Sequence, residues 1–249
     1  MALSRIEQAA RNSAIWCDTV CRAHGAPGEF YDVLWLDRHP APRFYPNVVT
    51  LSDQQSVTAQ RAHIHDLMAT GLPDGWGVKD SFCALDLAPS GFQPLFEAAW
   101  LWRAPSQTIA KSTADGIHWT SVRSAPDLAR WEATWSVDAA FQLPPVQTRL
   151  FLPSLLADQE IVFIAAYKND QIVGGAIAKH TDGVVGLSNV FGPVDDAMSF
   201  WAGCVATAQT SFPGVPLVGY ARLPDLVVAQ AVGFEMLQAL RVWIRSGSC

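Results

Sequence analysis

Three side chains near the start of the chain have the types and the spacing of metal ligands. Cys17, Cys21 and His24 stand at positions i, i+4 and i+7 of an expected helix, which would place them on one face. No fourth ligand is evident, and the same face is apolar. Packed thiols are therefore the better interpretation, and we expect no metal site.

The sequence contains none of the common motifs for nucleotide binding or nucleophilic hydrolysis. Neither a Walker sequence nor Gly-x-Ser-x-Gly occurs, and Gly75-Trp76-Gly77 is too short for a phosphate loop. His63 and His65 are two residues apart, so on a helix they point to different sides and are expected at the surface. No single motif identifies a reaction, so the function has to be inferred from the order of the secondary-structure elements.

The composition is that of an apolar, mildly acidic globular chain. Half of its 249 residues are apolar and 16% are charged, which allows a sizeable core. The formal net charge of -6, without a basic stripe, argues against nucleic acid as a partner. No apolar run approaches the roughly 20 residues of a bilayer span, and Met1–Ala10 lacks the apolar core of a secretion signal. Five scattered cysteines indicate reduced thiols, so we expect a cytoplasmic protein with no membrane partner. The oligomeric state is not indicated.

The first part of the chain, residues 1–103, alternates helical and strand-like segments. Ser4 and Glu7 have the spacing of a capping box at the start of a helix. The expected elements are helices over Ser4–Ala23 and Gln54–Ala69, and strands over Phe30–Leu36, Asn47–Leu51 and Phe96–Arg103. Ser81–Leu87 is expected as a short strand or as a strand that enters a turn. Residues 104–118 are poor in large apolar side chains and are interpreted as a linker.

The last part, residues 119–249, begins with a strand and a helix and then forms a three-stranded meander. The expected strands are Trp119–Val122, Ile161–Tyr167, Gln171–His180, Val184–Phe191, Leu217–Ala221 and Phe234–Arg245. Helices are expected from Ser124 to about Val137, after Asp195 and Asp196, and over Asp225–Ala231.

This order of elements resembles the GCN5-related N-acetyltransferase (GNAT) superfamily. Three stretches carry the resemblance: Ile161–Tyr167, Gln171–Ala178 with its Gly-Gly pair, and Ala231–Trp243, which opens on Gly-Phe-Glu. The resemblance implies a mixed α/β fold with a central mixed sheet flanked by helices. The Gly-Phe segment that ends at Arg245 also occurs earlier, from Gly91 to Arg103, at one constant offset. A tandem arrangement with a shortened N-terminal copy and a chance similarity of two apolar strands both remain open.

The resemblance implies that acetyl-CoA is the co-substrate and that it lies where two neighbouring strands separate. Mapped onto this chain, the strand Val184–Phe191 and the residue after it would supply the cofactor contacts, namely Asn189, Val190, Phe191 and Gly192. In such a fold a basic, Gly-rich loop then opens a helix and holds the pyrophosphate.

The corresponding loop of this chain departs from that pattern. It reads Phe191-Gly-Pro-Val-Asp-Asp-Ala197, without a second glycine and with two carboxylates. Each carboxylate about 4 Å from a phosphate would be repelled by about 1–4 kcal/mol. Alternatively, Asp195 and Asp196 cap the following helix themselves. Either way, binding of acetyl-CoA is in doubt.

The catalytic residues are less clear than the fold. The family often has a tyrosine four residues before the Gly-Phe pair, and here that position is Ala229. Tyr220 is the nearest substitute as an acid, and Glu160 at a strand start is a candidate base. A tyrosine in the core or cleft wall and a solvated charge are the alternative interpretations.

Two functions follow from these observations. The first is transfer of an acetyl group from coenzyme A to an amine of a small molecule or peptide. The second is a non-catalytic GNAT-like protein that binds a small molecule or a protein partner in a groove between its domains. Trp131 and Trp135 share a helix face that would border the acceptor cleft, although core packing is the better interpretation. The acceptor itself is not identified.

Overall fold

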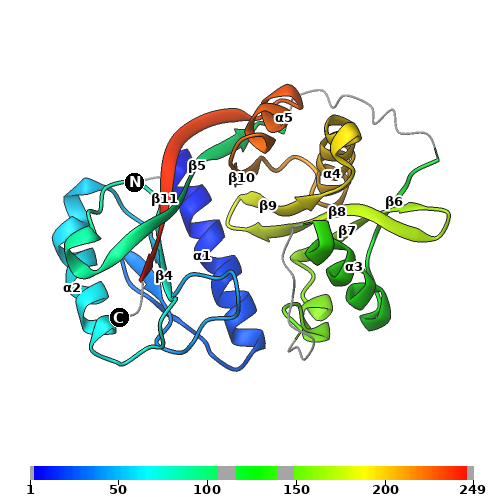
Figure 1. Cartoon of the computed structure of the whole chain (residues 1–249). Coiled ribbons are helices and arrows are strands. Elements are labelled where there is room, and N and C mark those ends of the chain that lie inside the picture. The colour runs from blue at the N-terminus through cyan, green and yellow to red at the C-terminus, as the bar shows by residue number, and fades with distance from the viewer. Residues whose placement is uncertain (1–2, 106–115, 139–148, 246–249) are drawn as a thin grey trace. The chain divides into compact units, whose positions relative to one another are not determined.

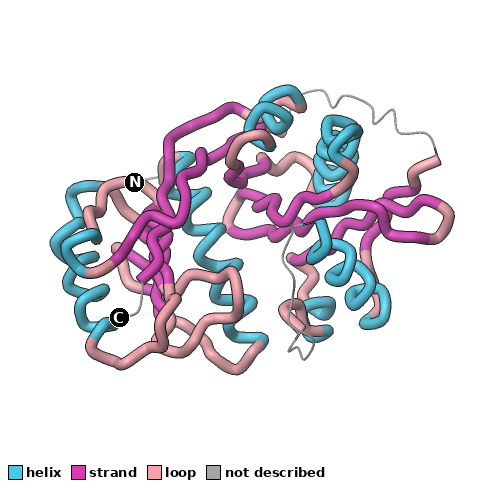
Figure 2. The backbone as a smooth tube through the Cα atoms, viewed as in Figure 1, coloured by secondary structure: helices cyan, strands magenta, loops and turns pink. Residues whose placement is uncertain are grey.

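The computed structural model describes residues 3–105, 116–138 and 149–245. As predicted, the fold is mixed α/β, with helices flanking mixed strands (Figure 2). The chain divides into two compact units: unit 1 comprises Met1–Trp100 and Leu237–Cys249, and unit 2 comprises Leu101–Met236. Most of the expected linker, 104–118, lies outside the described residues, and the boundary at 103 stays a prediction.

Unit 1 contains two helices and a short mixed set of strands (Figure 1). Its helices are α1 (Arg5–Ala23) and α2 (Val57–Met68), with single 3-10 turns η1 (Gln54–Ser56) and η2 (Ala88–Ser90). Its strands are β1 (Glu29–Phe30), β2 (Leu34–Leu36), β3 (Val48–Thr50) and β4 (Gly77–Asp80). β2 runs antiparallel to β1 and β3, whereas β3 and β4 are parallel.

Helix α1 begins as predicted and buries its cysteines. The side chain of Ser4 accepts the backbone N–H of Glu7 at 3.3 Å, and the Glu7 carboxylate accepts that of Ser4 at 2.7 Å. Cys17 and Cys21 pack against Trp35 in one apolar cluster, and burial raises the pKa of the Cys17 thiol. The described residues contain no group of three or more side chains that could hold a metal ion. Cys17 and Cys21 are thus packed thiols, as interpreted from the sequence.

Unit 2 consists of a strand and helix, the meander, and two further helices. Its strands are β6 (His118–Ser121), β7 (Ile161–Lys168), β8 (Gln171–Thr181), β9 (Val184–Phe191) and β10 (Leu217–Ala221). Its helices are α3 (Ala125–Asp138), α4 (Ala197–Ser211) and α5 (Asp225–Ala231), with 3-10 turns η3 (Pro153–Ala157) and η4 (Val194–Asp196). β6, β7, β8 and β9 pair antiparallel in that order, which confirms the predicted meander.

The Gly-Gly pair of β8 is explained by aromatic rings. A Cβ at Gly174 would come within 2.4 Å of the Phe200 ring, and one at Gly175 within 2.6 Å of the Trp131 indole nitrogen. Because successive strand residues point to opposite faces, the two glycines admit one ring on each side of the sheet. A side chain at either position would displace a buried ring.

Trp131 is a core residue, as the preferred interpretation held. Its indole N–H donates to Ile164 O at 2.8 Å, and its ring packs against Phe151, Phe163 and Phe191. Trp135 stacks on it with ring centroids 6.4 Å apart.

Two long strands, β5 (Phe92–Arg103) and β11 (Glu235–Arg245), extend through both units. In unit 1 the strand order is β1-β2-β3-β4-β11-β5, and in unit 2 it is β5-β10-β9-β8-β7-β6. In unit 1, β11 lies between β4 and β5 and runs antiparallel to β4; in unit 2, β10 lies beside β9. The tandem arrangement stays a prediction. No helix in the described residues has the length and apolar character needed to span a bilayer.

Two predicted strands differ from the structure. Phe30–Leu36 is not one strand but contributes to the antiparallel pair β1 and β2. Within Ser81–Leu87, residues 81–83 form a turn and a bend and residues 84–87 have no regular structure, so the strand lies just before this segment, in β4. The reason is Asp80, whose buried carboxylate accepts the backbone N–H groups of Phe82, Ala84 and Leu85 and so closes a turn. Desolvation raises the pKa of this carboxyl group, and the three N–H groups oppose that rise.

Candidate active site

The parallel strands β9 and β10 pair only at their starts. Their register joins two residues of each strand, Leu217 with Val185 and Val218 with Gly186. Gly219 still lies close to β9, since a Cβ there would come within 2.7 Å of Leu187 O. Over the described remainder of both strands, up to Phe191, the register does not continue. The carboxyl ends of β9 and β10 are thus two neighbouring strands without a shared ladder.

A bulge in β9 lies where the pairing ends. On the β8 side Gly175 is opposite Phe191 and Ile177 is opposite Ser188, so β9 has one more residue than β8 in this interval. Asn189 adopts a positive φ of 53° within it. Such a bulge bends its strand and ends regular pairing. Asn189 was expected to contact a cofactor, whereas the bulge was not expected, although an asparagine inside an apolar strand was a usable signal.

Beyond Gly186 the register with β10 gives the backbone of β9 no ladder partner on that side. Backbone N–H and C=O groups need partners, and an extended ligand that carries amides can supply them in the manner of an added strand. Asn189 and Val190 are half-buried, Phe191 is buried, and Gly192 is half-buried at the end of the strand. These are the four residues expected to contact a cofactor.

The loop after β9 closes on itself as a 3-10 turn. Pro193 has no N–H, the N–H of Asp196 donates to Pro193 O at 3.1 Å, and that of Ala197 donates to Val194 O. Few of its amides therefore remain for an anion.

The prediction that Asp195 and Asp196 cap helix α4 is not supported by the geometry. Asp196 is the N-cap residue, but its side chain makes no capping hydrogen bond in the described part of the chain. Its φ of -114° and ψ of 17° lie outside the extended region from which an N-cap side chain reaches the next amides. Asp195, within η4, also makes no cap there. Both carboxylates are exposed.

Gly192 has a packing reason to be glycine. A Cβ at this position would come within 2.5 Å of Cδ1 of Phe200, the same ring that faces Gly174. Phe200 is buried and meets Trp119 edge-on, with ring centroids 5.6 Å apart. The glycine that resembles part of a phosphate loop thus accommodates an aromatic ring from α4.

Tyr220 lies on β10 beyond the last paired residue, and its side chain is 37% exposed. Ala229, which occupies the position where a tyrosine was sought, is fully buried in α5 and its carbonyl accepts the N–H of Phe234 at 3.0 Å. Tyr220 therefore places a hydroxyl-bearing side chain just beyond the last residue of β10 that pairs with β9, whereas Ala229 has no hydroxyl group.

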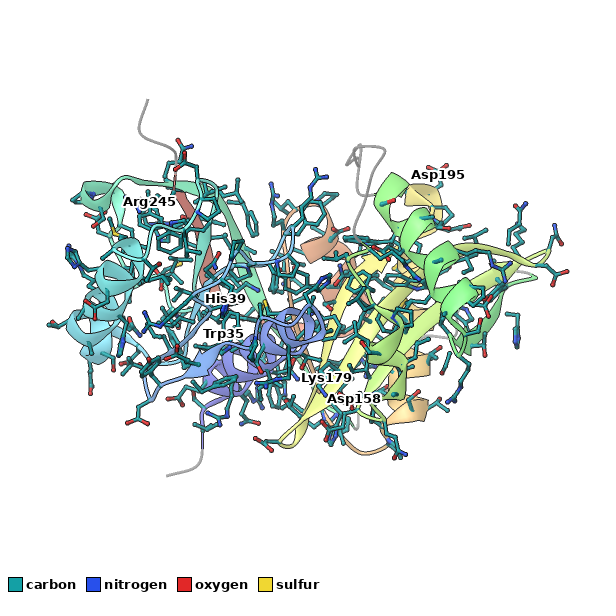
Figure 3. The ribbon with its side chains drawn as sticks, turned by 90° about the horizontal axis from the view of Figure 1, so that it is seen from below. Trp35, His39, Asp158, Lys179, Asp195 and Arg245 are labelled. Carbon is teal, nitrogen blue, oxygen red and sulfur yellow. The ribbon has the colours of Figure 1, made fainter. Side chains whose placement is uncertain are left out.

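Glu160 is engaged by a buried lysine. The ammonium group of Lys179, 5% exposed, lies 3.0 Å from Glu160 and 2.9 Å from Asp158 (Figure 3). Lys179 is opposite Gly186 in the paired part of β9, whereas Asp195 lies beyond the other end of that strand. Glu160 at the start of β7 and Tyr220 on β10 are three strands apart, or about 14 Å at the usual spacing. The structure does not bring the two candidates together.

Unit 1 contains a comparable parallel pair, β3 and β4, that is bridged. Its register joins Val48 with Val78 and Val49 with Lys79. Immediately beyond, the hydroxyl oxygen of Thr50 accepts the backbone N–H of Ser81 at 2.8 Å. The buried amide of Gln60 donates to Ser52 O at 2.7 Å. In unit 1, side chains thus bond to the backbone just beyond the paired residues.

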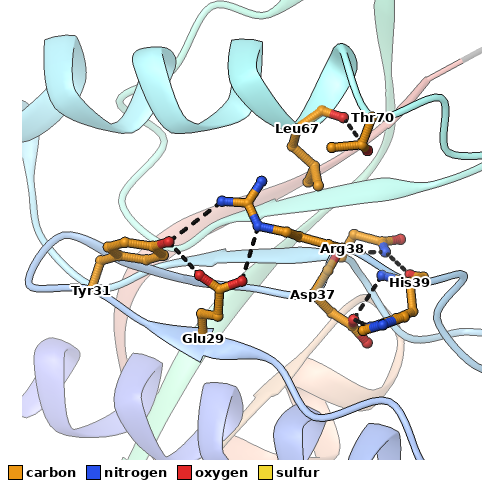
Figure 4. Close-up of polar contacts among 8 residues, drawn as sticks. Glu29, Tyr31, Asp37, Arg38, His39, Leu67 and Thr70 are labelled. Carbon is orange, nitrogen blue, oxygen red and sulfur yellow. Dashed lines mark hydrogen bonds and ion pairs between the residues drawn. The ribbon is translucent and has the colours of Figure 1, made fainter.

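A second polar cluster in unit 1 has a structural role (Figure 4). Buried Asp37 accepts the backbone N–H of His39 and lies 2.9 Å from its Nδ1, and Asn47 donates to the carbonyl groups of both residues. Arg38 donates to Glu29 at 2.9 Å. These bonds tie the end of β2 to β1 and to the residue before β3.

The comparisons with known proteins bear on the fold. No family model and no curated protein sequence matches the chain. A GCN5-related N-acetyltransferase from Kribbella flavida is 15% identical, with a TM-score of 0.65 and 96% of both chains covered. One from Sphaerobacter thermophilus is 13% identical, with a TM-score of 0.54 over 100% of this chain and 98% of that one. A putative acetyltransferase of the GNAT family from Novosphingobium aromaticivorans is 11% identical, with a TM-score of 0.54 over 96% and 99%.

At these identities the likeness concerns architecture, which it covers almost from end to end. The chain has the fold of the GCN5-related N-acetyltransferases.

Proposed function

We propose that the protein transfers an acyl group from a thioester, with acetyl-CoA as the first candidate, to an amine of a small molecule or peptide. The observation that carries the proposal is the loss of pairing between β9 and β10 at the Asn189 bulge. Pantetheine is an extended arm with two amides, so it suits open strand backbone of this kind. The fold shared with N-acetyltransferases supports the same reaction class.

In this reaction the amine attacks the thioester carbonyl carbon. A C–N bond forms, the C–S bond breaks, the amine loses a proton and the leaving thiolate gains one. Backbone groups of Asn189, Val190, Phe191 and Gly192 are proposed to hold the arm, with an N–H at the bulge polarising the carbonyl group. Tyr220 is the proposed acid, because its exposed hydroxyl side chain lies on the strand that borders the unpaired segment.

Glu160 is a separate proposal as the base, and its ion pair with Lys179 competes with that role. The variant Glu160→Gln separates the two possibilities. If Glu160 acts as a base, turnover falls while the free energy of unfolding is kept. If Glu160 instead stabilises Lys179, the free energy of unfolding falls because a buried ammonium group loses one of two carboxylate partners.

Two measurements test the proposed function: calorimetric titration with acetyl-CoA and with S-acetylpantetheine, and release of free thiol in the presence of a panel of amines. We expect one donor site per chain, because the parallel strands of unit 1 are bridged by Thr50. Tyr220→Phe should keep donor binding and lower turnover by about 10²–10⁴. Tyr167→Phe, a tyrosine of β7, is the matched control. Absence of donor binding together with absence of thiol release for every amine rejects the proposal.

A second candidate function is binding without catalysis, of a small molecule or a protein partner. The observation that favours it is the loop Gly192–Ala197, closed as a 3-10 turn with two exposed carboxylates where a transferase would hold phosphates. Binding of a thioester without thiol release for any amine would select this candidate. We also propose a tandem arrangement and a cytoplasmic location, the latter supported by the free thiols of Cys17, Cys21, Cys83 and Cys204.

A further inference from the structure

The loop after β9, Gly192–Ala197, bears on which part of an acyl donor the protein can bind. A nucleotide pyrophosphate is bound at a helix start by N–H groups that have no other partner and by the positive end of the helix dipole. In this chain the loop has a proline at one position, and the N–H groups of Asp196 and Ala197 are bonded within the turn itself. The backbone therefore offers only the amides of Val194 and Asp195 from the four residues after Pro193.

The side chains of the same loop oppose an anion further. Asp195 and Asp196 are exposed, and neither carboxylate caps the helix in the described residues. Their negative charges act on any phosphate placed at the helix start and offset the attraction of the helix dipole.

The remaining surface of the loop is apolar. Val194 is 84% exposed and Met198, in the first turn of α4, is 58% exposed. Apolar side chains provide no hydrogen bonds for phosphate oxygens. Three independent features of one segment, its bonded amides, its carboxylates and its apolar side chains, thus disfavour the nucleotide end of coenzyme A.

The other end of the donor faces a different environment. The open backbone around Asn189 carries no charge and remains suited to the amides of a pantetheine arm. We infer that the acyl donor is recognised through its pantetheine arm alone, and that the donor class is acylated pantetheine thioesters without a nucleotide. This inference rests on the proposed function, because it assumes that β9 receives a thioester.

A series of three donors tests it: S-acetylpantetheine with no phosphate, S-acetyl-4′-phosphopantetheine with one, and acetyl-CoA with the complete nucleotide. Affinities are measured by calorimetric titration of the full chain at low ionic strength, where charge effects are least screened. The expected result is that S-acetylpantetheine binds as tightly as acetyl-CoA, within threefold, or more tightly. An acetyl-CoA affinity more than threefold higher overturns the inference and leaves the proposed function standing. Failure of all three to bind overturns both.

Charge variants provide a second readout. Asp195→Asn with Asp196→Asn should raise the affinity for acetyl-CoA about tenfold and leave that for S-acetylpantetheine unchanged. The matched control is Asp182→Asn, which removes a charge from the exposed turn between β8 and β9, at the opposite end of β9. It should alter neither affinity. If the double variant changes both donors equally, or neither, the loop does not select the donor in this way.

Discussion

The ring of Phe200 gives a quantitative test of why the chain has glycine after β9. In a phosphate loop a glycine lets the backbone approach the ligand, so its replacement affects binding. Here Gly192 faces Phe200, and a Cβ would lie 2.5 Å from Cδ1, 2.8 Å from Cγ and 3.2 Å from Cβ of that residue. Carbon atoms in contact are normally about 3.5–4.0 Å apart, so the first overlap is about 1 Å.

The ring has little freedom to move away. It is buried, meets Trp119 edge-on, and lies so close to Gly174 that a Cβ there would come within 2.4 Å. We therefore expect Gly192→Ala to lower the free energy of unfolding by about 1–3 kcal/mol, the usual effect of overfilling a packed core. Phe200→Leu removes the ring atoms that clash, so the double variant should be more stable than the sum of the two effects by at least about 1 kcal/mol.

Urea denaturation of the two single variants and the double variant measures this coupling. Gly219→Ala is the matched control, since a Cβ there meets Leu187 O and not the ring of Phe200. Combined with Phe200→Leu, it should be additive within about 0.5 kcal/mol. The reasoning is refuted if Gly192→Ala keeps the stability of the wild type and weakens only donor binding, because the glycine would then serve a ligand.

Three further predictions concern single elements. Asn189→Val should lower the free energy of unfolding by about 1–2 kcal/mol and weaken donor binding, whereas Asn189→Gly should keep both, because only the β-branched residue is strained at a φ of 53°; equal stability in urea denaturation would contradict this. Ser124→Ala should remove about 1 kcal/mol at pH 7, since the Ser124 hydroxyl caps α3 at the N–H of Asp127 and donates to its carboxylate. Hydrogen bonds from Ser124 and then Arg130 lower the pKa of Asp127, so the part of this stabilisation that the carboxylate contributes is present above about pH 3.9 and is lost as the pH falls through the lowered pKa, whereas the cap on the N–H of Asp127 remains; a difference between the two proteins that does not shrink at low pH would contradict it. Tyr220→Phe should lower the rate of thiol release at unchanged donor affinity. An equal loss of rate and affinity would indicate that Tyr220 contacts the donor without acting as the acid.

The strands of the meander were predictable because their apolar residues form continuous runs separated by turn residues. Ile161 to Tyr167 and Val184 to Phe191 needed no tertiary information. Strand β4 was missed because Gly75 and Gly77 indicate a turn, whereas its pairing with β3 and β11 depends on residues far away in the sequence. The error over Ser81–Leu87 has a similar origin. Its apolar residues suggest a strand, but the carboxylate of Asp80 binds the amides that a strand would need.

The candidate cofactor residues came from the resemblance, and their role stays a prediction. The resemblance located Asn189 to Gly192, and the end of the β9–β10 register falls beside them. The wrong prediction of a helix cap at Asp196 shows which part of the loop geometry could not be predicted from the residue pattern. A side chain caps a helix only when its backbone has suitable φ and ψ angles. The angles of Asp196 depend on the 3-10 turn η4, which the residue pattern did not predict.

The two parallel strand pairs share a topology and differ in the residues that follow the paired segment. Both β3–β4 and β9–β10 begin with two paired residues, and in both the chain leaves the first strand for a 3-10 turn and a helix. In unit 1 the hydroxyl group of Thr50 accepts the N–H of Ser81 immediately afterwards, so the backbone is satisfied within the protein. In unit 2 the segment around Asn189 bulges instead. Topology alone therefore does not leave strand backbone free for a donor, because one side chain at the end of a strand is enough to bond to that backbone.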